Sequence, residues 1–195
     1  VSPDTQIQAM VFVREFKDDE SLLFCTRKGT IKKTKLSQYS NVRSTGIKAI
    51  KIEPGDELIE VAVTSGNNDI VIATKHGLSV RFHESDVRDM GRDTTGVKGI
   101  ELRPDDRVVG MVVIKREATL LVVTEKGLGK CTHIDDYRVQ KRGGKGILTV
   151  NRTEKTGDVV ALMEVLPEDE IMLITRGGIV IRSSVDQVRV TGRNA

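Results

Sequence analysis

The sequence predicts an all-β protein, built as a propeller-like array of four-stranded antiparallel blades. Four copies of one phrase carry this prediction, each an apolar β-run followed by Thr, two further residues and Gly. The copies end at Gly29, Gly77, Gly127 and Gly178, so successive glycines are 48, 50 and 51 residues apart. A fixed period in this range indicates a propeller, a solenoid or an array. The short, β-branched runs indicate that the repeating unit is made of strands.

Each unit opens with a predicted hairpin. The apolar run forms its first strand, and the Gly supplies the positive φ that a tight turn requires. The second strand follows directly, over Thr30–Thr34, Leu78–His83, Leu128–His133 and Ile179–Arg182. Ten residues after each Gly we expect a residue that anchors the following loop: Tyr39, Val87, Tyr137 or Val188.

The loop then leads to a second recurring phrase and a closing strand. Thr45–Ile50 and Thr95–Ile100 are two copies, Lys145–Leu148 is a looser third, and their glycines are 50 residues apart. A polar turn comes next. The closing strands are predicted over Leu58–Val63, Val108–Ile114 and Val159–Val165. Four strands per unit is the size of a propeller blade.

We expect residues 1–195 to form one domain that is a piece of a longer array. The predicted divisions are the end of one blade at 1–17, blades at about 18–66, 67–115 and 116–166, and a partial blade at 167–195. Ile7–Val13 is predicted to be the last strand of the earlier blade. Unpaired sheet edges in such a piece invite pairing with another chain.

Composition argues against several classes of function. No apolar run is long enough to span a bilayer, and no signal peptide opens the chain, so we expect a cytoplasmic protein without a membrane partner. Cys25 and Cys131 are expected to be buried, small apolar residues in a reducing compartment. His76, His83 and His133 lack ligand spacing, and no carboxylate pair, nucleophile elbow or zinc motif is found. We expect no catalytic residue, metal or cofactor in this chain.

Charge is segregated within each unit. The formal net charge is only +3. The hairpin-plus-loop segments (26–51, 74–98, 124–146 and 175–195) nevertheless sum to +15, and the rest of the chain to −12. The first segment holds eight Lys or Arg and no Asp or Glu, whereas the second is only +1. Because equivalent positions of successive blades face the same way, the basic segments are expected to line up as a track for a polyanion. Solvated loops are the alternative.

Duplex DNA bent around a basic outer surface is the polyanion that fits best. No helix-in-groove motif is present to read bases, and Tyr39 and Tyr137 are too few to stack single strands. Binding by phosphate neutralisation and DNA deformability needs neither. The positions expected to contribute most lie on the second strands: Lys32, Lys33, Arg81, Lys130 and Arg182.

A glycine-rich stretch in the third unit, residues 140–146, is the most specific segment, and we call it the box. It reads Gln-Lys-Arg-Gly-Gly-Lys-Gly and differs from a Walker loop in spacing. Its glycines could bring backbone N–H groups and three cations against phosphate. A flexible connection is the alternative. The full set of candidate DNA contacts is Arg27, Lys28, Lys32, Lys33, Lys35, Arg43, Lys48, Arg81, Arg92, Lys98, Lys130, Arg138, Gln140, Lys141, Arg142, Gly143, Gly144, Lys145, Gly146, Arg182 and Arg189.

With these phrases and the box, the chain resembles the C-terminal, DNA-wrapping β-pinwheel domain of DNA gyrase A, the A subunit of a type IIA topoisomerase. The hallmark box of that family reads Gln-Arg-Arg-Gly-Gly-Lys-Gly, and residues 140–146 match it except at Lys141. The resemblance covers essentially all 195 residues. In the family the box lies in the first blade, whereas earlier units precede it here. Residues 140–146 are therefore either the principal box or a later echo, and both readings stay open.

The resemblance implies a non-catalytic domain that wraps duplex DNA for a bacterial, nucleoid-associated type II topoisomerase, an isomerase that introduces negative supercoils. It implies gyrase B and the N-terminal part of gyrase A as partners in a heterotetramer, with ATP and Mg²⁺ bound outside this domain. Tyr39 and Tyr137 occupy a repeated structural position and are not the active-site nucleophile. Three alternatives remain: the equivalent domain of topoisomerase IV, a propeller-type protein-interaction module, and an enzyme domain built from repeats.

Overall fold

The computed structural model describes residues 6–195 and is all-β over that range. Its helical elements are four short 3₁₀ turns, and no α-helix occurs among the described residues. The hairpin strands are β1 (Ser21–Thr26), β2 (Thr30–Lys35), β4 (Asp69–Thr74), β5 (Leu78–His83), β8 (Thr119–Thr124), β9 (Gly129–His133), β12 (Glu170–Ile174) and β13 (Val180–Ser184). The closing strands are β3 (Leu58–Thr64), β7 (Val108–Ile114) and β11 (Val159–Val165).

The remaining elements are small. Two-residue strands form at β6 (Val97–Lys98) and β10 (Ile147–Leu148), and the 3₁₀ turns are η1 (Leu36–Tyr39), η2 (Glu84–Asp86), η3 (Ile134–Asp136) and η4 (Val185–Gln187). Each 3₁₀ turn directly follows the second strand of a hairpin. The predicted all-β class with almost no helix is therefore confirmed.

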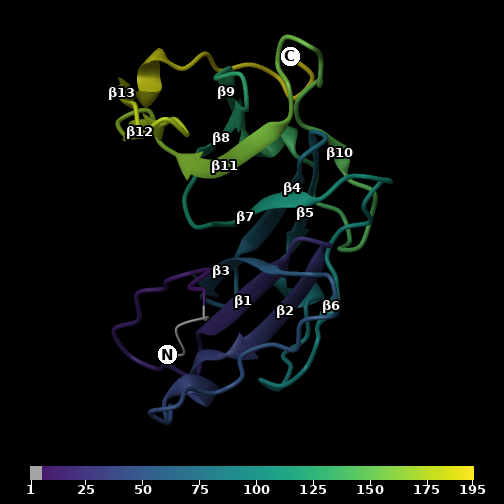
Figure 1. Cartoon of the computed structure of the whole chain (residues 1–195), viewed down its shortest axis with the longest axis vertical. Helices are drawn as coiled ribbons and strands as arrows, with labels where there is room; N and C mark the ends of the chain where they lie inside the picture. The colour runs from purple at the N-terminus through teal and green to yellow at the C-terminus, as the bar shows by residue number, and fades with distance from the viewer. Residues whose placement is uncertain (1–5) are drawn as a thin grey trace.

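The sheets follow one another along the long axis of the molecule (Figure 1). Blade 1 has the order β3-β1-β2-β6, blade 2 β10-β5-β4-β7, and blade 3 β11-β8-β9, while β12 and β13 pair as the sheet of the fourth unit. All the strand pairs are antiparallel. The hairpins and closing strands lie where the sequence predicts them.

The fourth strand corrects the expectation of a self-contained unit. In blade 1 it is β6, from the second unit, with Thr30 opposite Lys98 and Ile31 opposite Val97. In blade 2 it is β10, from the third unit, with Ser79 opposite Ile147. Each of these two recurring phrases therefore completes the blade before its own, and successive units are interlocked.

Glycine is required directly before β6 and β10, the strands that pair with the preceding blade. Gly96 has φ +113° and Gly146 φ +75°. A Cβ on Gly96 would lie 2.6 Å from the Ile31 carbonyl oxygen, and one on Gly146 would lie 2.6 Å from that of Ser79. Both oxygens belong to a strand of the preceding blade, so the two backbones approach too closely for a side chain.

The apolar core runs from one blade into the next. One cluster joins Leu23, Cys25 and Ile31 of blade 1 to Ile70 and Phe82 of blade 2. Cys25 and Cys131 are free and buried as predicted, and burial raises the pKa of both thiols. The expected loop anchors Tyr39, Val87 and Tyr137 are buried as well, and Val188 packs against a core cluster. Units that pack on their neighbours are typical of repeat proteins.

Two predicted strands do not form. Ile7–Val13 has no strand, and Ile7, Met10 and Phe12 are exposed, so the strand expected here does not form in the described chain. Thr45–Ile50, the first Thr-Gly phrase, also lacks a strand. In both cases the described residues contain no blade on which the segment could pair. No helix in residues 6–195 is long and apolar enough to cross a membrane.

Candidate nucleic-acid interface

The loops of the second, third and fourth units are each held on the second strand of the blade before, a contact that we call a seam. Met90 N–H donates to the Lys33 carbonyl at 2.8 Å, and Gln140 N–H donates to the Arg81 carbonyl at 2.8 Å. At the third seam the Thr191 N–H donates to the Cys131 carbonyl at 2.9 Å. Parallel bridges accompany all three contacts. The basic loops are therefore fixed to the sheets at regular intervals.

Two lysines of the second strands lie inside seams. Lys32 is fully buried, and its ammonium donates to the carbonyl oxygens of Ala49, at 2.5 Å, and Arg92. Lys130 is 9% exposed and donates to Gly192, at 2.8 Å, and Arg193 in the same way. Burial lowers the pKa of each lysine to about 8, because removal from water disfavours the charged form.

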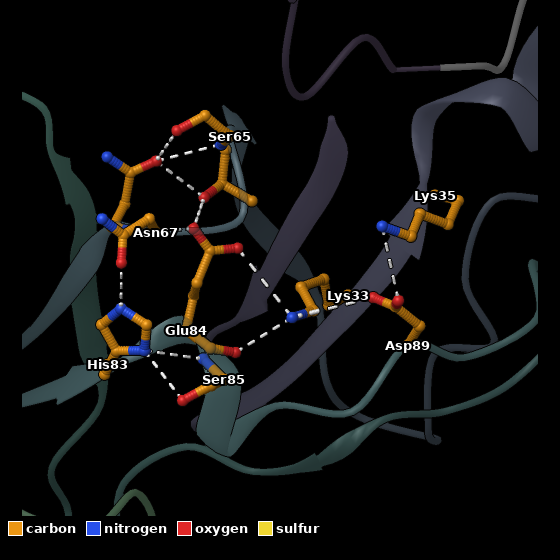
Figure 2. Close-up of polar contacts among 10 residues, drawn as sticks. Lys33, Lys35, Ser65, Asn67, His83, Glu84, Ser85 and Asp89 are labelled. Carbon is orange, nitrogen blue, oxygen red and sulfur yellow. Dashed lines mark hydrogen bonds and ion pairs between the residues drawn. The ribbon is translucent and has the colours of Figure 1, made fainter. Parts of the chain in front are cut away.

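Lys33 and Arg81 make equivalent contacts one residue further on. Lys33 Nζ donates to the Glu84 carbonyl at 3.1 Å, and Arg81 donates to the Ile134 carbonyl at 2.7 Å. Each side chain thus supplies a hydrogen bond to the backbone carbonyl of the first residue in the next 3₁₀ turn. Figure 2 shows Lys33 between Glu84 and Asp89. Arg81 also pairs with Asp69 at 2.7 Å.

Glu84 makes the first seam unlike the others. Its carboxylate is fully buried, and one oxygen accepts from the Thr64 hydroxyl and, at 2.8 Å, from the Asn68 N–H. The other oxygen accepts no hydrogen bond from the described residues and lies 3.9 Å from Lys33 Nζ. The equivalent positions of the other units carry buried apolar residues: Leu36, Ile134 and Val185.

These contacts correct the choice of leading DNA contacts on the second strands. We call four residues the seam cations: Lys32, Lys33, Arg81 and Lys130. Their charged groups bind carbonyl oxygens and carboxylates inside the protein. A group so engaged would have to break those bonds before it could bind phosphate. These internal bonds argue against the four side chains as DNA contacts. Arg182 is exposed on β13 and pairs with Glu170.

Acidic residues also lie closer to the basic segments than expected. Arg27 in the first hairpin turn pairs with Glu57 at 2.8 Å. The neighbouring Lys28 N–H donates to Asp56 at 2.9 Å, and its ammonium to the Pro54 carbonyl at 3.3 Å. The polar turns thus pack on the hairpin turns, and their acidic residues lie beside the basic ones. Two further candidates are partnered by loop carboxylates, Lys35 by Asp89 and Lys48 by Asp93.

The box contains both internal and outward-facing groups. Gly143, at φ +78°, donates its N–H to the Gly99 carbonyl at 2.6 Å, and the Gly144 carbonyl accepts from the Glu101 N–H at 2.9 Å. Arg142 reaches back to the second unit and donates to the carbonyls of Asp86, at 2.8 Å, and Lys98, at 3.0 Å. The amide nitrogen of Gln140 is buried without a hydrogen-bond partner in the described chain. The box glycines and Arg142, which sequence reasoning assigned to phosphate binding, therefore join the units.

Lys141 and Lys145 are the outward cations of the box, since both are exposed. Lys98, from the second unit, lies against Gly143, with its side chain 3.7 Å from the position that a Cβ would take there. Units two and three thus bring three lysines to one place. Seven candidates are exposed, and their side chains have no carboxylate partner in residues 6–195: Lys28, Arg43, Lys98, Arg138, Lys141, Lys145 and Arg189. Arg92 is half-buried, and its carbonyl accepts a hydrogen bond from Lys32.

Sequence reasoning missed Arg88. It is exposed and has no ion pair with the described residues, and it precedes Arg138 by 50 residues. Its position directly after the anchor Val87 matches that of Arg138 after Tyr137 and that of Arg189 after Val188. The repeat spacing alone could have identified it.

The family model for the DNA gyrase C-terminal domain, a β-propeller, matches residues 20–65, 68–115, 118–165 and 169–195. The chain belongs to this family. DNA gyrase A of Clostridium acetobutylicum is 49% identical over 195 residues, and that of Escherichia coli is 39% identical over 191. These alignments cover 100% and 98% of this chain but only 24% and 22% of the relatives. The chain therefore spans about a quarter of their length.

Solved structures support the same assignment. A DNA gyrase A C-terminal domain matches with a TM-score of 0.84 and 27% identity, over 92% of this chain and 60% of that one. The C-terminal domain of a DNA topoisomerase IV matches with a TM-score of 0.91 over 100% of this chain and 61% of that one. At 24% identity, the second likeness speaks for the fold alone. The predicted membership of the DNA gyrase A family is thus confirmed.

Proposed function

We propose that this gyrase C-terminal domain binds, bends and wraps duplex DNA, and that it contributes no catalytic residue to the reaction. The observation that carries the proposal is the set of exposed Lys and Arg without carboxylate partners in the described chain, repeated on loops that the seams hold in place. Cations fixed on successive blades neutralise phosphates along a duplex, and this requires no contact with bases.

The activity of the whole protein is part of the proposal. The relatives are named as the A subunits of DNA gyrases. We infer a bacterial type II topoisomerase that uses ATP and Mg²⁺ bound outside this domain. In that assembly gyrase B and the N-terminal part of gyrase A would be the partners, in the cytoplasm and at the nucleoid. The domain would supply the wrapped DNA from which strand passage introduces negative supercoils.

A DNA titration across salt concentrations tests the binding step. The logarithm of the affinity should fall linearly with the logarithm of the salt concentration, by about 0.9 for each phosphate contact. A bending assay on short duplexes then tests wrapping. A protein-interaction module without a nucleic-acid role would show no binding at physiological salt, and that result would refute the proposal.

The equivalent domain of topoisomerase IV is the second candidate, because a topoisomerase IV domain has the same fold. The box in residues 140–146 favours gyrase, since it keeps six of the seven hallmark residues. The full-length protein in complex with its B-type partner decides between the two. Gyrase would introduce negative supercoils into relaxed plasmid, whereas topoisomerase IV would leave relaxed plasmid unchanged and would only relax a supercoiled one.

A further inference from the structure

One position of the repeat carries an exposed arginine in three successive units. Each arginine directly follows the residue that anchors its loop, and the steps are 50 and 51 residues: Arg88, Arg138 and Arg189. The first unit has Ser40 at this position. Because each arginine comes directly after its anchor, the three arginines occupy equivalent positions relative to their seams.

The backbone at this position is held on both sides. Before the arginine, the anchor N–H donates to the first carbonyl of the 3₁₀ turn, at 3.0 Å for Val87, 3.0 Å for Tyr137 and 2.9 Å for Val188. Two residues after it, the seam hydrogen bond ties the loop to the preceding blade. The arginine therefore projects from a short segment fixed at both ends, which lowers the entropy cost of placing its side chain on a ligand.

The side chains themselves are uncommitted. All three are exposed, and within residues 6–195 none of the three guanidinium groups makes a hydrogen bond or an ion pair. Four residues later, in the loops of the third and fourth units, an arginine turns inward. Arg142 donates to two carbonyls of the second unit, and Arg193 donates to the Leu148 carbonyl at 2.8 Å. Arg142 and Arg193 thus join units, whereas Arg88, Arg138 and Arg189 are free to bind an anion such as phosphate.

We propose that Arg88, Arg138 and Arg189 are the principal phosphate contacts of this domain, one at each seam. The inference rests on the proposed function, because it takes duplex DNA as the polyanion. A guanidinium binds phosphate through two parallel hydrogen bonds, which gives direction as well as charge. Contacts fixed on successive blades hold the duplex at separate points, so the path between them follows the array and bends the DNA.

A pair of triple variants of the whole chain tests this assignment. R88Q/R138Q/R189Q removes the three outward arginines. R103Q/K126Q/R176Q removes the same charge from exposed turn residues that, among the described residues, have no hydrogen bond or ion pair through their side chains. Both variants should unfold like the wild type, since no internal contact is lost. Duplex affinity is then measured across salt concentrations for all three proteins.

The seam variant should reduce the salt slope by about 2.7, or 0.9 for each arginine. It should also lose DNA bending. The control should keep most of the slope and the bend. Equal losses in the two variants would mean that only general charge matters and would overturn the assignment. A wild-type protein that fails to bind duplex at low salt would instead overturn the proposed function, and this inference with it.

Discussion

Lys32 and Lys141 both come from the basic part of a repeat, but their surroundings are opposite. The Lys32 ammonium lies inside the first seam, where two carbonyl oxygens accept its hydrogens. Lys141 is exposed on the box. The same contrast holds between Arg142, which joins two units, and Arg138, which has no internal side-chain contact in the described chain. Positive charge in this fold therefore has two uses, to fix one unit on the next and to face a polyanion.

The contact between successive units should be disrupted most severely at the glycines that precede β6 and β10, the strands that pair with the preceding blade. Gly146→Ala places a methyl group 2.6 Å from the Ser79 carbonyl, at a φ of +75° that Ala adopts poorly. We expect a loss of about 4 kcal/mol or more in the free energy of unfolding, because a buried strand cannot move aside. Urea denaturation measures the loss.

Gly46→Ala is the matched control. Gly46 has nearly the same φ, +82°, but no described atom lies within 4 Å of its added Cβ. It should lose only about 1–2 kcal/mol, the cost of the left-handed conformation. Equal losses in the two variants would show that conformation, and not the close approach to Ser79, makes the glycine necessary.

Local patterns predict the strands of this fold but not their partners. The apolar run Leu58–Val63 and the turn glycines such as Gly29 act over a few residues, so the hairpins and closing strands follow from them. The pairing of Val97 with Ile31 joins residues 66 positions apart and depends on how one unit packs on the next. That information lies in the register between repeats, which the period alone does not give.

The candidate contacts divide for the same reason. A lysine on a strand is usually solvated. Lys32 is buried only because the loop of the next unit brings the Arg92 carbonyl to it. The predicted contacts include Arg138 and Arg189, and the repeat spacing would have added Arg88. Whether any of these residues touches DNA stays a prediction.

A second way to sharpen the comparison is the ion pair of the first seam. Leu36 occupies the position of the first unit that is equivalent to Glu84, so Glu84→Leu makes the two units alike at this position. The change leaves Lys33 buried without its carboxylate partner. We expect a loss of about 3 kcal/mol, at the low end for a broken buried pair because Asp89 also lies 3.7 Å from Lys33.

The double variant K33M/E84L should recover part of that stability, since well-packed apolar residues often replace a buried pair at little cost. The Asn68 N–H, which donates to Glu84 in the wild type, still lacks this acceptor in the double variant. Chemical denaturation of the two single variants and the double variant gives the coupling energy. If the double variant is as unstable as the sum of the singles, Lys33 and Glu84 do not act as a pair.

The box offers the third comparison, within a single loop. Arg142→Ala should lower the free energy of unfolding by about 1–2 kcal/mol, because two charged hydrogen bonds to the second unit disappear. K141A/K145A should leave unfolding unchanged and weaken duplex binding, because both side chains are exposed. Thermal unfolding and a salt titration of DNA binding on the same samples separate the two effects. A stable Arg142→Ala protein would argue against the role of Arg142 in joining the units.

The last prediction is a pH dependence of the first seam. Burial lowers the pKa of Lys32 to about 8, whereas an unfolded chain holds a lysine pKa near 10.4. Between about pH 8 and pH 10.4 the unfolded state binds more protons than the folded state, so the contribution of Lys32 to stability rises with pH. Urea unfolding of wild type and Lys32→Met should therefore diverge, with the wild type gaining relative to the variant as pH increases through this window. The comparison cancels Lys130, which has a similarly lowered pKa in the third seam and is present in both proteins. A difference that stays constant or shrinks with pH would mean that the Lys32 ammonium keeps its proton in the seam, held by the carbonyls of Ala49 and Arg92 despite its burial.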